Sequence, residues 1–367
     1  MLIQLVVCSK GALVITKLTS RMTECAPPEW YKKMTRLPEY LKRPIIDTET
    51  TKTVRRILKT KCLNTVCEGA RCPNKAECYS KNTATFLIMG NVCTRNCRYC
   101  NISTARPQPL DLEEPRHVAE AVKELGLKFA VITSVTRDDL PDGGAEHFKN
   151  CIEEIRKVCD AKIEILTPDM KGNKQALDTI ISAHPDVFNH NIETVRSVFK
   201  TARPQGNYDC SLEVLRYVKE NSDIVTKSGL MVGLGATHVD RSKYIGSTDN
   251  SKSINSSYNS KSASAYSSST SAPLAGEVAQ SAVGGYKEIE ETLLDLKRVG
   301  VDIVTIGQYI QPSKAHLEVA KYYTLAEFEE LKELARKIGF KNFQIGPLVR
   351  SSYQAMNCFN DAYSVNY

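Results

Sequence analysis

The sequence has 367 residues, of which 42% are hydrophobic and 25% are charged; this is the composition of a globular protein and excludes a disordered or collagen-like chain. The net charge of +7 comes from lysines and arginines interspersed with acids, so no nucleic-acid partner is predicted. No apolar run is long enough to span a bilayer, so no membrane association is predicted either.

Residues 1–50 are predicted to be an N-terminal extension. The first residues carry Lys10, Lys17 and Arg21 and no acid before Glu24, which is compatible with an organelle transit peptide. A secretory signal is the alternative, but here the charges lie after and within the apolar part. We therefore predict a mitochondrial location, with a plastid or the bacterial cytoplasm as alternatives.

Residues 51–82 are predicted to be a metal-binding segment. A helix is expected over Thr51–Lys59, followed by Cys67, Cys72 and Cys78 in C-x4-C-x5-C spacing. The cysteine stretch has little apolar periodicity, so its order is expected to depend on a bound metal. Of the 13 cysteines, six fall between Cys67 and Cys100, which favours metal binding in a reducing compartment over a disulfide scaffold.

Residues 83–345 alternate short β-type runs with helical stretches. The expected strands are Phe86–Met89, Phe129–Thr133, Ile163–Leu166, Val187–His190, Leu230–Val232 and Ile303–Ile306. The expected helices are Pro115–Leu125, Glu146–Val158, Lys174–Ala183, Ile192–Phe199, Ser211–Lys219, Tyr286–Val299 and a last one that begins at a capping box of Thr324 and Glu327. Six such repeats predict an α/β fold, a partial (βα)6 TIM-like barrel with its chemistry at the carboxyl ends of the strands.

An insertion at about 238–282 interrupts this pattern. It is dominated by Ser, Asn, Thr and Lys and has almost no aliphatic residues. Such a segment cannot bury enough surface to offset its ordering entropy, so it is predicted to be disordered. A phosphorylated regulatory loop is the alternative.

The stretch NVCTRNCRYC places Cys93, Cys97 and Cys100 in a C-x3-C-x2-C triplet directly after the apolar run Thr85–Met89. Three thiolates on one loop can hold three corners of an iron–sulfur cube and leave the fourth iron open to a ligand. Zinc is the alternative, but zinc prefers closed four-ligand sites and this loop supplies only three cysteines.

The two triplets together, with ATFLIMGNVCTRNCRYC, resemble those of the lipoyl synthases, a family of radical S-adenosylmethionine (SAM) enzymes. The resemblance extends through VITSVTRDDLPDGGAEHF, VFNHNIETV, VDIVTIGQYIQPSKAHL and GPLVRSSYQA, and covers nearly everything from Pro38 to Ala355 except the insertion. It implies the radical SAM barrel, with residues 346–367 as a C-terminal tail that carries the R-S-S-Y motif.

The resemblance also implies the roles of the cysteines. One [4Fe-4S] cluster on Cys93, Cys97 and Cys100 would bind and reduce SAM to yield a 5′-deoxyadenosyl radical, which removes hydrogen from carbons 6 and 8 of a protein-bound octanoyl-lysine. A second [4Fe-4S] cluster would donate the two sulfurs and be consumed. Its ligands would be Cys67, Cys72 and Cys78, with Ser352 of the R-S-S-Y motif as the fourth. A serine oxygen suits iron less well than a thiolate, which fits a ligand that must be released.

SAM itself is expected near Tyr99, Asn189, Glu193, Gly233 and Gly235. Polar residues around the second and fourth strands are predicted to face SAM or substrate, with capping or loop roles as the alternative: Ser134, Arg137, Asp138, Asp139 and Asn191. His184 and His190 are predicted to be packed or loop histidines. The family commonly reads GLGE after the fifth strand, where this chain ends the motif with Ala236.

The resemblance implies protein partners. These are octanoylated lipoyl-carrier domains, as in 2-oxoacid dehydrogenase E2 subunits and the glycine cleavage H protein, and an electron donor such as ferredoxin or flavodoxin. The alternatives are a biotin-synthase-like sulfur insertase, a non-catalytic zinc-binding protein and an inactive lipoyl synthase homologue. Iron and acid-labile sulfide would exclude the zinc protein.

Overall fold

The computed structural model describes residues 37–43, 48–81, 83–235, 285–357 and 359. The chain divides into two compact units, Met1–Glu39 and Tyr40–Tyr367, and the second unit contains both cysteine triplets. The predicted transit peptide, the Ser-rich insertion and Ala236 all lie outside the described residues. No helix in the described part is long and apolar enough to cross a membrane.

An eight-stranded sheet organises the second unit. Its strand order is β1-β2-β5-β6-β7-β8-β9-β10, parallel throughout except for β1, which pairs antiparallel with β2. Its strands are β1 (Asn64–Thr65), β2 (Thr85–Ile88), β5 (Phe129–Ser134), β6 (Lys162–Leu166), β7 (Val187–Asn189), β8 (Val225–Val232), β9 (Ile303–Gln308) and β10 (Asn342–Gly346). The two short strands β3 (Val92–Cys93) and β4 (Ser103–Thr104) pair separately in the loop that follows β2.

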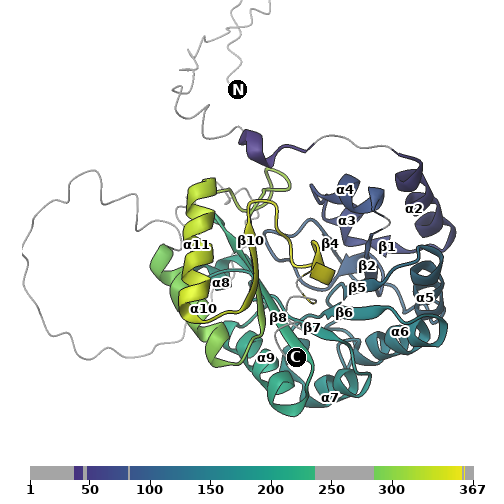
Figure 1. Ribbon diagram of the computed structural model, residues 1–367. Helices are drawn as coiled ribbons and strands as arrows, with labels where there is room; N and C mark the ends of the chain where they lie inside the picture. The colour runs from purple at the N-terminus through teal and green to yellow at the C-terminus, as the bar shows by residue number, and fades with distance from the viewer. Residues whose placement is uncertain (1–36, 44–47, 82, 236–284, 358, 360–367) are drawn as a thin grey trace, which may run out of the picture. The chain divides into compact units, whose positions relative to one another are not determined.

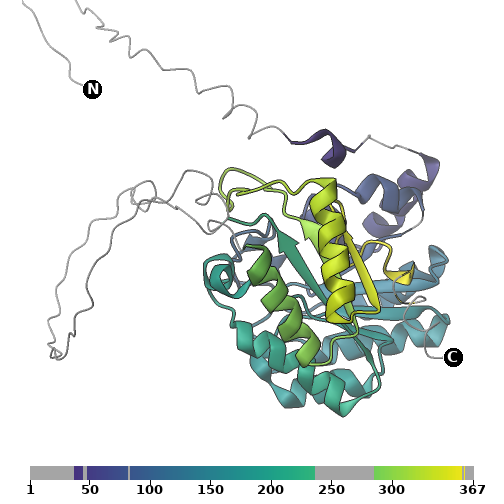
Figure 2. The same cartoon turned by 60° about the vertical axis from the view of Figure 1, so that its left-hand side comes forward.

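Helices alternate with the strands and lie along the outside of the curved sheet (Figures 1 and 2). They are η1 (Glu39–Leu41), α2 (Glu49–Thr60), α3 (Val66–Gly69), α4 (Lys75–Ser80), α5 (Glu114–Glu124), α6 (Ala145–Val158), η2 (Met170–Gly172), α7 (Lys174–Ser182), α8 (Arg196–Ala202), α9 (Tyr208–Asn221), α10 (Tyr286–Arg298) and α11 (Leu325–Ile338). The capping box predicted at Thr324 is present, with both reciprocal hydrogen bonds to Glu327.

The two faces of the sheet differ in character. One row of register partners, Phe86, Ile132, Ile165 and Phe188, is fully buried in the main hydrophobic core with the helices. The neighbouring row carries Thr133, Asn189 and Lys227, which are polar and also buried. The polar row therefore faces the inside of the barrel, where the carboxyl ends of the strands converge.

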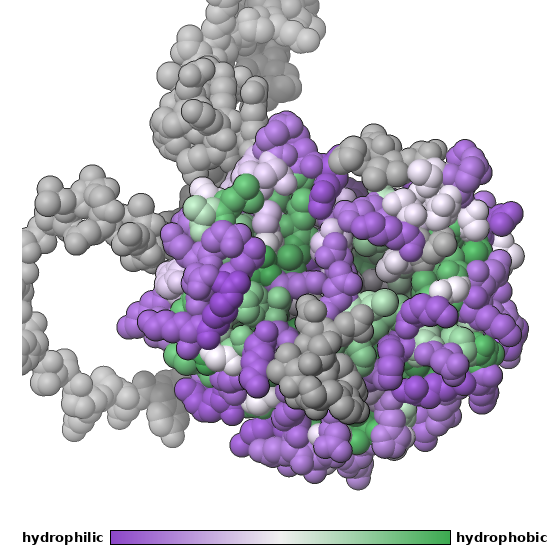
Figure 3. All heavy atoms as spheres, in the orientation of Figure 1, coloured by the Kyte–Doolittle hydropathy of each residue, from purple (hydrophilic) through white to green (hydrophobic). Residues whose placement is uncertain are grey.

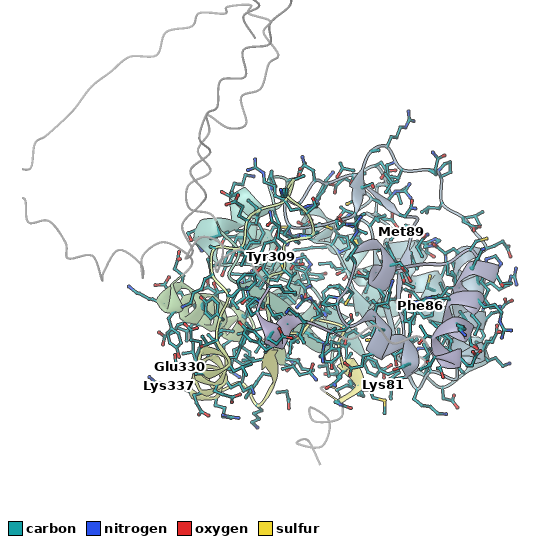
Figure 4. The ribbon with its side chains drawn as sticks, turned by 90° about the horizontal axis from the view of Figure 1, so that it is seen from above. Lys81, Phe86, Met89, Tyr309, Glu330 and Lys337 are labelled. Carbon is teal, nitrogen blue, oxygen red and sulfur yellow. The ribbon has the colours of Figure 1, made fainter. Side chains whose placement is uncertain are left out.

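The surface views agree with this division. The outer helices are mostly hydrophilic, and apolar colour gathers between them (Figure 3). Seen from above, Phe86 and Met89 lie within the body of the fold near β2, and Tyr309 lies across from them, while Glu330 and Lys337 mark the outer helix α11 (Figure 4). The described residues that could bind a polar ligand therefore lie on the inner face of the sheet.

All six predicted strands are confirmed, with small changes at their ends. β8 begins at Val225, five residues before the predicted start, because its polar residues Thr226, Lys227 and Ser228 are buried toward the barrel interior. β10 was not predicted, since its five residues include only two aliphatic or aromatic side chains. It adds a seventh parallel strand to the six.

The helix predicted over Ile192–Phe199 is wrong at its start. α8 begins at Arg196, and Glu193 has a φ of 70°, which a helix cannot accommodate. The segment from Asn191 to Val195 is a loop at the carboxyl end of β7. Its Glu193 N–H donates to the Gly229 carbonyl at 2.9 Å, which holds the loop against β8.

The cysteine segment before the barrel is better packed than its sequence suggested. It forms the short helices α3 and α4, and Cys67 and Tyr79 belong to the hydrophobic core. The Tyr79 hydroxyl lies 2.9 Å from the Thr65 hydroxyl in a buried hydrogen bond. The expectation that its order depends on metal alone is therefore wrong, because part of it comes from the core.

Candidate functional site

The C-x3-C-x2-C loop follows β2 directly and is held at its first cysteine by backbone donors. The Cys93 sulfur accepts the N–H groups of Arg95 at 3.4 Å and Thr136 at 3.3 Å. The Thr94 N–H and hydroxyl both donate to the Thr136 carbonyl. The loop is thus fastened to the segment after β5, and donors already point at a sulfur that would carry negative charge on binding iron.

A buried arginine lies within this loop. Arg95 forms bidentate pairs with Asp169, at 2.7 Å for both contacts, and with Asp138, at 2.7 and 2.8 Å. The side chains of Arg95 and Asp169 are each 3% exposed, and the Arg95 hydrogen bonds hold the pKa of Asp169 well below its usual range against the opposing effect of burial. The cysteine loop is therefore bound to the ends of β5 and β6 by fixed charges. The sequence prediction included Asp138 but missed Arg95 and Asp169.

The thiols of this loop lie close enough to affect one another. Burial raises the pKa of Cys100 to about 12, and the nearby Cys97 and Cys93 add to the rise. Burial also raises the pKa of Cys97, partly offset by Arg203. Without metal these two are neutral thiols. Metal binding would release their protons, so a cluster here would assemble with proton release.

Tyr99 and Glu193, both predicted near SAM, come together beside Cys97. Burial raises the pKa of Glu193, and the positive charge of Arg203 opposes that rise; Tyr99 interacts with both Cys97 and Glu193. Asn191 donates to the Glu193 carboxyl at 3.2 Å, and Arg203 donates to the Asn191 carbonyl at 3.2 Å. Arg203 was missed because it lies beyond α8, far along the sequence from the motifs.

Asn189, the third residue predicted near SAM, lies deeper in the barrel. It donates to Glu164 at 2.9 Å, and Glu164 pairs with Lys227 at 2.9 Å, with both charged side chains 1% exposed. The amide N–H group of Asn189 is therefore already used inside the protein. Neither Glu164 nor Lys227 could be recognised from sequence, since each stands in the middle of a strand.

Gly233 and Gly235 lie where the chain after β8 runs along residues 318–321. A Cβ on Gly233 would stand 2.1 Å from the Lys321 carbonyl oxygen, and the residue has a φ of 79°. Gly235 donates its N–H to the Glu318 carbonyl at 3.2 Å. Both glycines thus serve close backbone packing, whatever further contact they make.

Buried polar atoms without a partner among the described residues gather at the ends of β5, β6 and β7. They are Ser134 Oγ, Thr167 Oγ1, Asn189 Oδ1, His190 Nε2, Asn191 Oδ1 and Arg203 Nε. Leaving one such atom unpaired costs about 1–3 kcal/mol, so a concentration of them at one edge indicates a polar ligand. The residues present therefore fit a polar ligand at this edge of the sheet.

The second triplet has Cys67 on α3, Cys78 on α4 and Cys72 in the turn between the two helices. Burial raises the pKa of Cys67 to about 11 and that of Cys78 to about 12, and Cys72 contributes to both rises. Cys67 and Cys78 are therefore neutral thiols without metal. Three thiols that interact electrostatically, on a segment next to β2, fit a second cluster.

The C-terminal tail is fastened to this second triplet on both sides of Ser352. Asn74 donates to the Leu348 carbonyl at 2.7 Å, and the Tyr353 hydroxyl donates to Glu77 at 3.0 Å. Ser352 is half-buried and its hydroxyl has no hydrogen-bond partner among the described residues, whereas the neighbouring Ser351 hydroxyl accepts from Asn191 at 3.2 Å. Of the two serines, Ser352 is the one left available.

Within the described ranges, no three His, Cys, Asp or Glu side chains are arranged to hold one metal ion. A zinc site needs its thiolates to converge on a single ion. A cube instead binds each thiolate to a different iron and so keeps them apart.

Comparison with known proteins identifies the family. Residues 87–245 match the radical SAM superfamily. The chain is 44% identical to the lipoyl synthase of Caldanaerobacter subterraneus over 87% of this chain and 96% of the relative. Its identity is 45% to the lipoyl synthase of Rubrobacter xylanophilus, over 89% and 87% of the two chains, and 46% to lipoyl synthase 2 of Gloeobacter violaceus, over 87% and 95%. The chain belongs to the lipoyl synthase family.

Membership in the lipoyl synthase family accounts for both triplets together. The radical SAM match begins at Leu87 in β2 and includes the C-x3-C-x2-C loop. The C-x4-C-x5-C triplet precedes it, and the three lipoyl synthase relatives match 87% or more of this chain. The predicted fold, a radical SAM partial barrel, is confirmed.

Proposed function

We propose that the chain inserts two sulfurs at carbons 6 and 8 of a protein-bound octanoyl-lysine, as a radical SAM sulfurtransferase of the lipoyl synthase family. The observation that carries this proposal is the attachment of the C-terminal tail to the second cysteine triplet, through Asn74 with Leu348 and Tyr353 with Glu77. These two bonds support Ser352 as the residue that would complete the triplet.

The residues present divide the work between the two triplets. With two [4Fe-4S] clusters and SAM bound, the enzyme would have both a means of abstracting hydrogen and a source of sulfur. The Cys93 loop would hold one cluster, with backbone N–H groups stabilising the charge on its first sulfur. Cys67, Cys72, Cys78 and Ser352 would hold the other. A carbon–hydrogen bond of an octanoyl chain yields to no acid or base, so the cofactors are needed.

The remaining polar residues would orient SAM. Glu193, Asn191 and Tyr99 place acceptors and donors beside Cys97, and the positive Arg203 lies behind them. The Glu193 backbone is bonded to Gly229 and Met231 of β8, which supports a fixed position for this carboxyl. Asn189 would contribute its unpaired carbonyl oxygen from deeper in the barrel.

We propose that the substrate is an octanoylated lipoyl-carrier domain and that reduction comes from a ferredoxin or flavodoxin. The mitochondrial location is proposed from these carriers and from the N-terminal extension, which lies outside the described residues; the three lipoyl synthase relatives are from bacteria. Replacing the carrier domain by an octanoyl-lysine peptide removes these partners from the first test.

The first experiment uses anaerobically reconstituted protein. Iron and sulfide are counted, and the protein is then mixed with SAM, a reductant and the octanoyl-lysine peptide, with products followed by mass spectrometry. We expect about eight irons per chain and a product that gains two sulfurs. Zinc in place of iron, or deoxyadenosine release with no sulfur gained, would contradict the proposal.

A matched pair of variants tests the fourth ligand. Ser352→Ala should abolish sulfur gain while deoxyadenosine release continues, because only the second cluster loses a ligand. Ser351→Ala removes a hydroxyl that only accepts a bond from Asn191, and should keep sulfur insertion. If Ser351→Ala fails and Ser352→Ala works, the ligand assignment is wrong.

A further inference from the structure

The two cysteine motifs touch at one point. Asn101 directly follows Cys100, and its side-chain amide donates to the Gly69 carbonyl at 2.8 Å. Gly69 ends α3, two residues after Cys67. One hydrogen bond therefore joins the residue next to the last ligand of one triplet to the helix that carries the first ligand of the other.

Gly69 packs so closely against its neighbours that a side chain at this position would clash with them. A Cβ added at Gly69 would stand 2.8 Å from Cδ1 of Ile102 and 3.9 Å from Cδ2 of Leu87. Gly69 does not have a positive φ, so its backbone alone would accept alanine. Close approach to Ile102 is therefore the reason that glycine suits this position.

Little else holds the two motifs together directly. Among the described residues, this is the one hydrogen bond between segments 66–80 and 91–104. A cavity of about 430 Å³ lies beside it, lined in part by Glu68, Gly69, Leu87 and Asn91. On that side open space separates the two segments, and the Asn101–Gly69 bond is the polar contact that bridges them.

We propose that the Asn101–Gly69 bond is an inter-motif clasp that sets the distance between the two clusters and thereby couples hydrogen abstraction at one to sulfur transfer from the other. This inference rests on the proposed function, since it assumes both clusters. Asn101 is a positioning residue, because it acts through the motifs and touches no reacting atom. A substrate carbon that loses hydrogen at one cluster can accept sulfur from the other only if the distance between the clusters is kept. A misplacement of about 1 Å can cost on the order of a hundredfold in rate.

The test distinguishes an effect on the spacing of the two motifs from an effect on folding, because a second substitution restores the packing at Gly69. In Gly69→Ala the new Cβ would stand 2.8 Å from Cδ1 of Ile102, so α3 and Ile102 must shift relative to each other, and the ratio of sulfur gained to deoxyadenosine released should fall about tenfold. Ile102→Val removes Cδ1, the atom that would clash, and should leave the ratio unchanged by itself. The double variant Gly69→Ala with Ile102→Val should recover most of the ratio. Alanine is the better helix former, so Gly69→Ala keeps α3.

Asn101→Ala provides an independent arm. It deletes the amide that donates to Gly69 and should lower the same ratio, with iron content and deoxyadenosine release close to those of the unmodified protein. A parallel fall in iron content, deoxyadenosine and sulfur gain would show a merely structural contact and would overturn the proposal. So would a Gly69→Ala defect that Ile102→Val does not relieve.

A spectroscopic readout keeps the inference separate from the proposed function. The dipolar coupling between the two reduced clusters, measured by pulsed electron paramagnetic resonance, reports their distance without any substrate. The clasp predicts a shifted coupling in Gly69→Ala and Asn101→Ala and a restored one in the double variant. If the unmodified protein gains no sulfur, the proposed function fails, and the coupling alone still decides whether the clasp sets the spacing. An unchanged coupling overturns it.

Discussion

The two cysteine triplets have the same number of ligands but are held in different ways. The Cys93 loop is bound by the buried Arg95, which forms bidentate pairs with Asp138 and Asp169 at the ends of two strands. The second triplet lies on two short helices and the turn between them, and its links to the tail and to the first motif are single hydrogen bonds from Asn74, Tyr353 and Asn101.

This difference matches what each site would have to do. A buried charge pair is costly to open, because breaking it leaves an uncompensated charge in a low-dielectric interior. A single hydrogen bond contributes only about 1 kcal/mol, and it can be broken and remade. The first site is thus built to stay fixed through many reactions, and the second can loosen as its cluster is taken apart.

The largest effect is expected from breaking the charge network. Arg95→Met leaves Asp169 and Asp138 without their partner and should lower the free energy of unfolding by about 3–5 kcal/mol. The variant should also lose the iron that the Cys93 loop would bind. Denaturant unfolding and iron counts under anaerobic conditions measure both.

Arg116→Met is the matched control for that variant. Arg116 pairs with Glu113 and Glu120 on the exposed face of α5, where solvent screens the charges. Its replacement should change neither the unfolding free energy nor the iron content measurably. If the two arginine variants behave alike, the buried network is not what holds the loop.

A buried histidine should make the first region sensitive to acid. His190 donates from Nδ1 to the Thr167 carbonyl at 2.8 Å, and burial lowers its pKa to about 4. The unfolded chain takes up this proton near pH 6.5, so between these values the unfolded state binds more protons. The stabilising contribution is therefore complete above about pH 6.5 and is lost as the pH falls toward 4.

This predicts a loss of about 2 kcal/mol between about pH 7 and about pH 5. His190→Asn keeps an amide donor for Thr167 and carries no titrating group, so most of that loss should disappear. Unfolding free energies of both proteins at the two pH values measure it. An equal loss in both proteins would assign the acid sensitivity to other groups.

The smallest effect is expected in the second region. Tyr353→Phe removes a donor to Glu77, which keeps its bond from Lys81 at 2.9 Å, so stability should fall by at most about 1 kcal/mol. The effect on the second cluster should be larger than the effect on stability, because the tail near Ser352 is held less tightly in this variant. Iron should be lost to a chelator faster from the second cluster alone; equal loss from both clusters would contradict the comparison.

Much of the architecture followed from local pattern. The strands of the barrel were readable because their outward rows are aliphatic or aromatic and their helices show one apolar face. The first half of β8 was not, since its polar residues are buried toward the barrel interior, and β10 was not, since it has only two aliphatic or aromatic side chains. The helix expected at Ile192 failed because Glu193 adopts a left-handed conformation that its side chain does not signal.

The sequence by itself determined the chemistry of this protein, because ligand types and spacings are local: two cysteine triplets and an R-S-S-Y tail can be read without any fold. Tertiary structure alone decided what supports them. Arg95 meets Asp169 across 74 residues, Asn74 meets Leu348 across 274, and Asn101 meets Gly69. These partners are ordinary polar residues in sequence, and they become a site only when parallel strands bring their carboxyl ends to one edge.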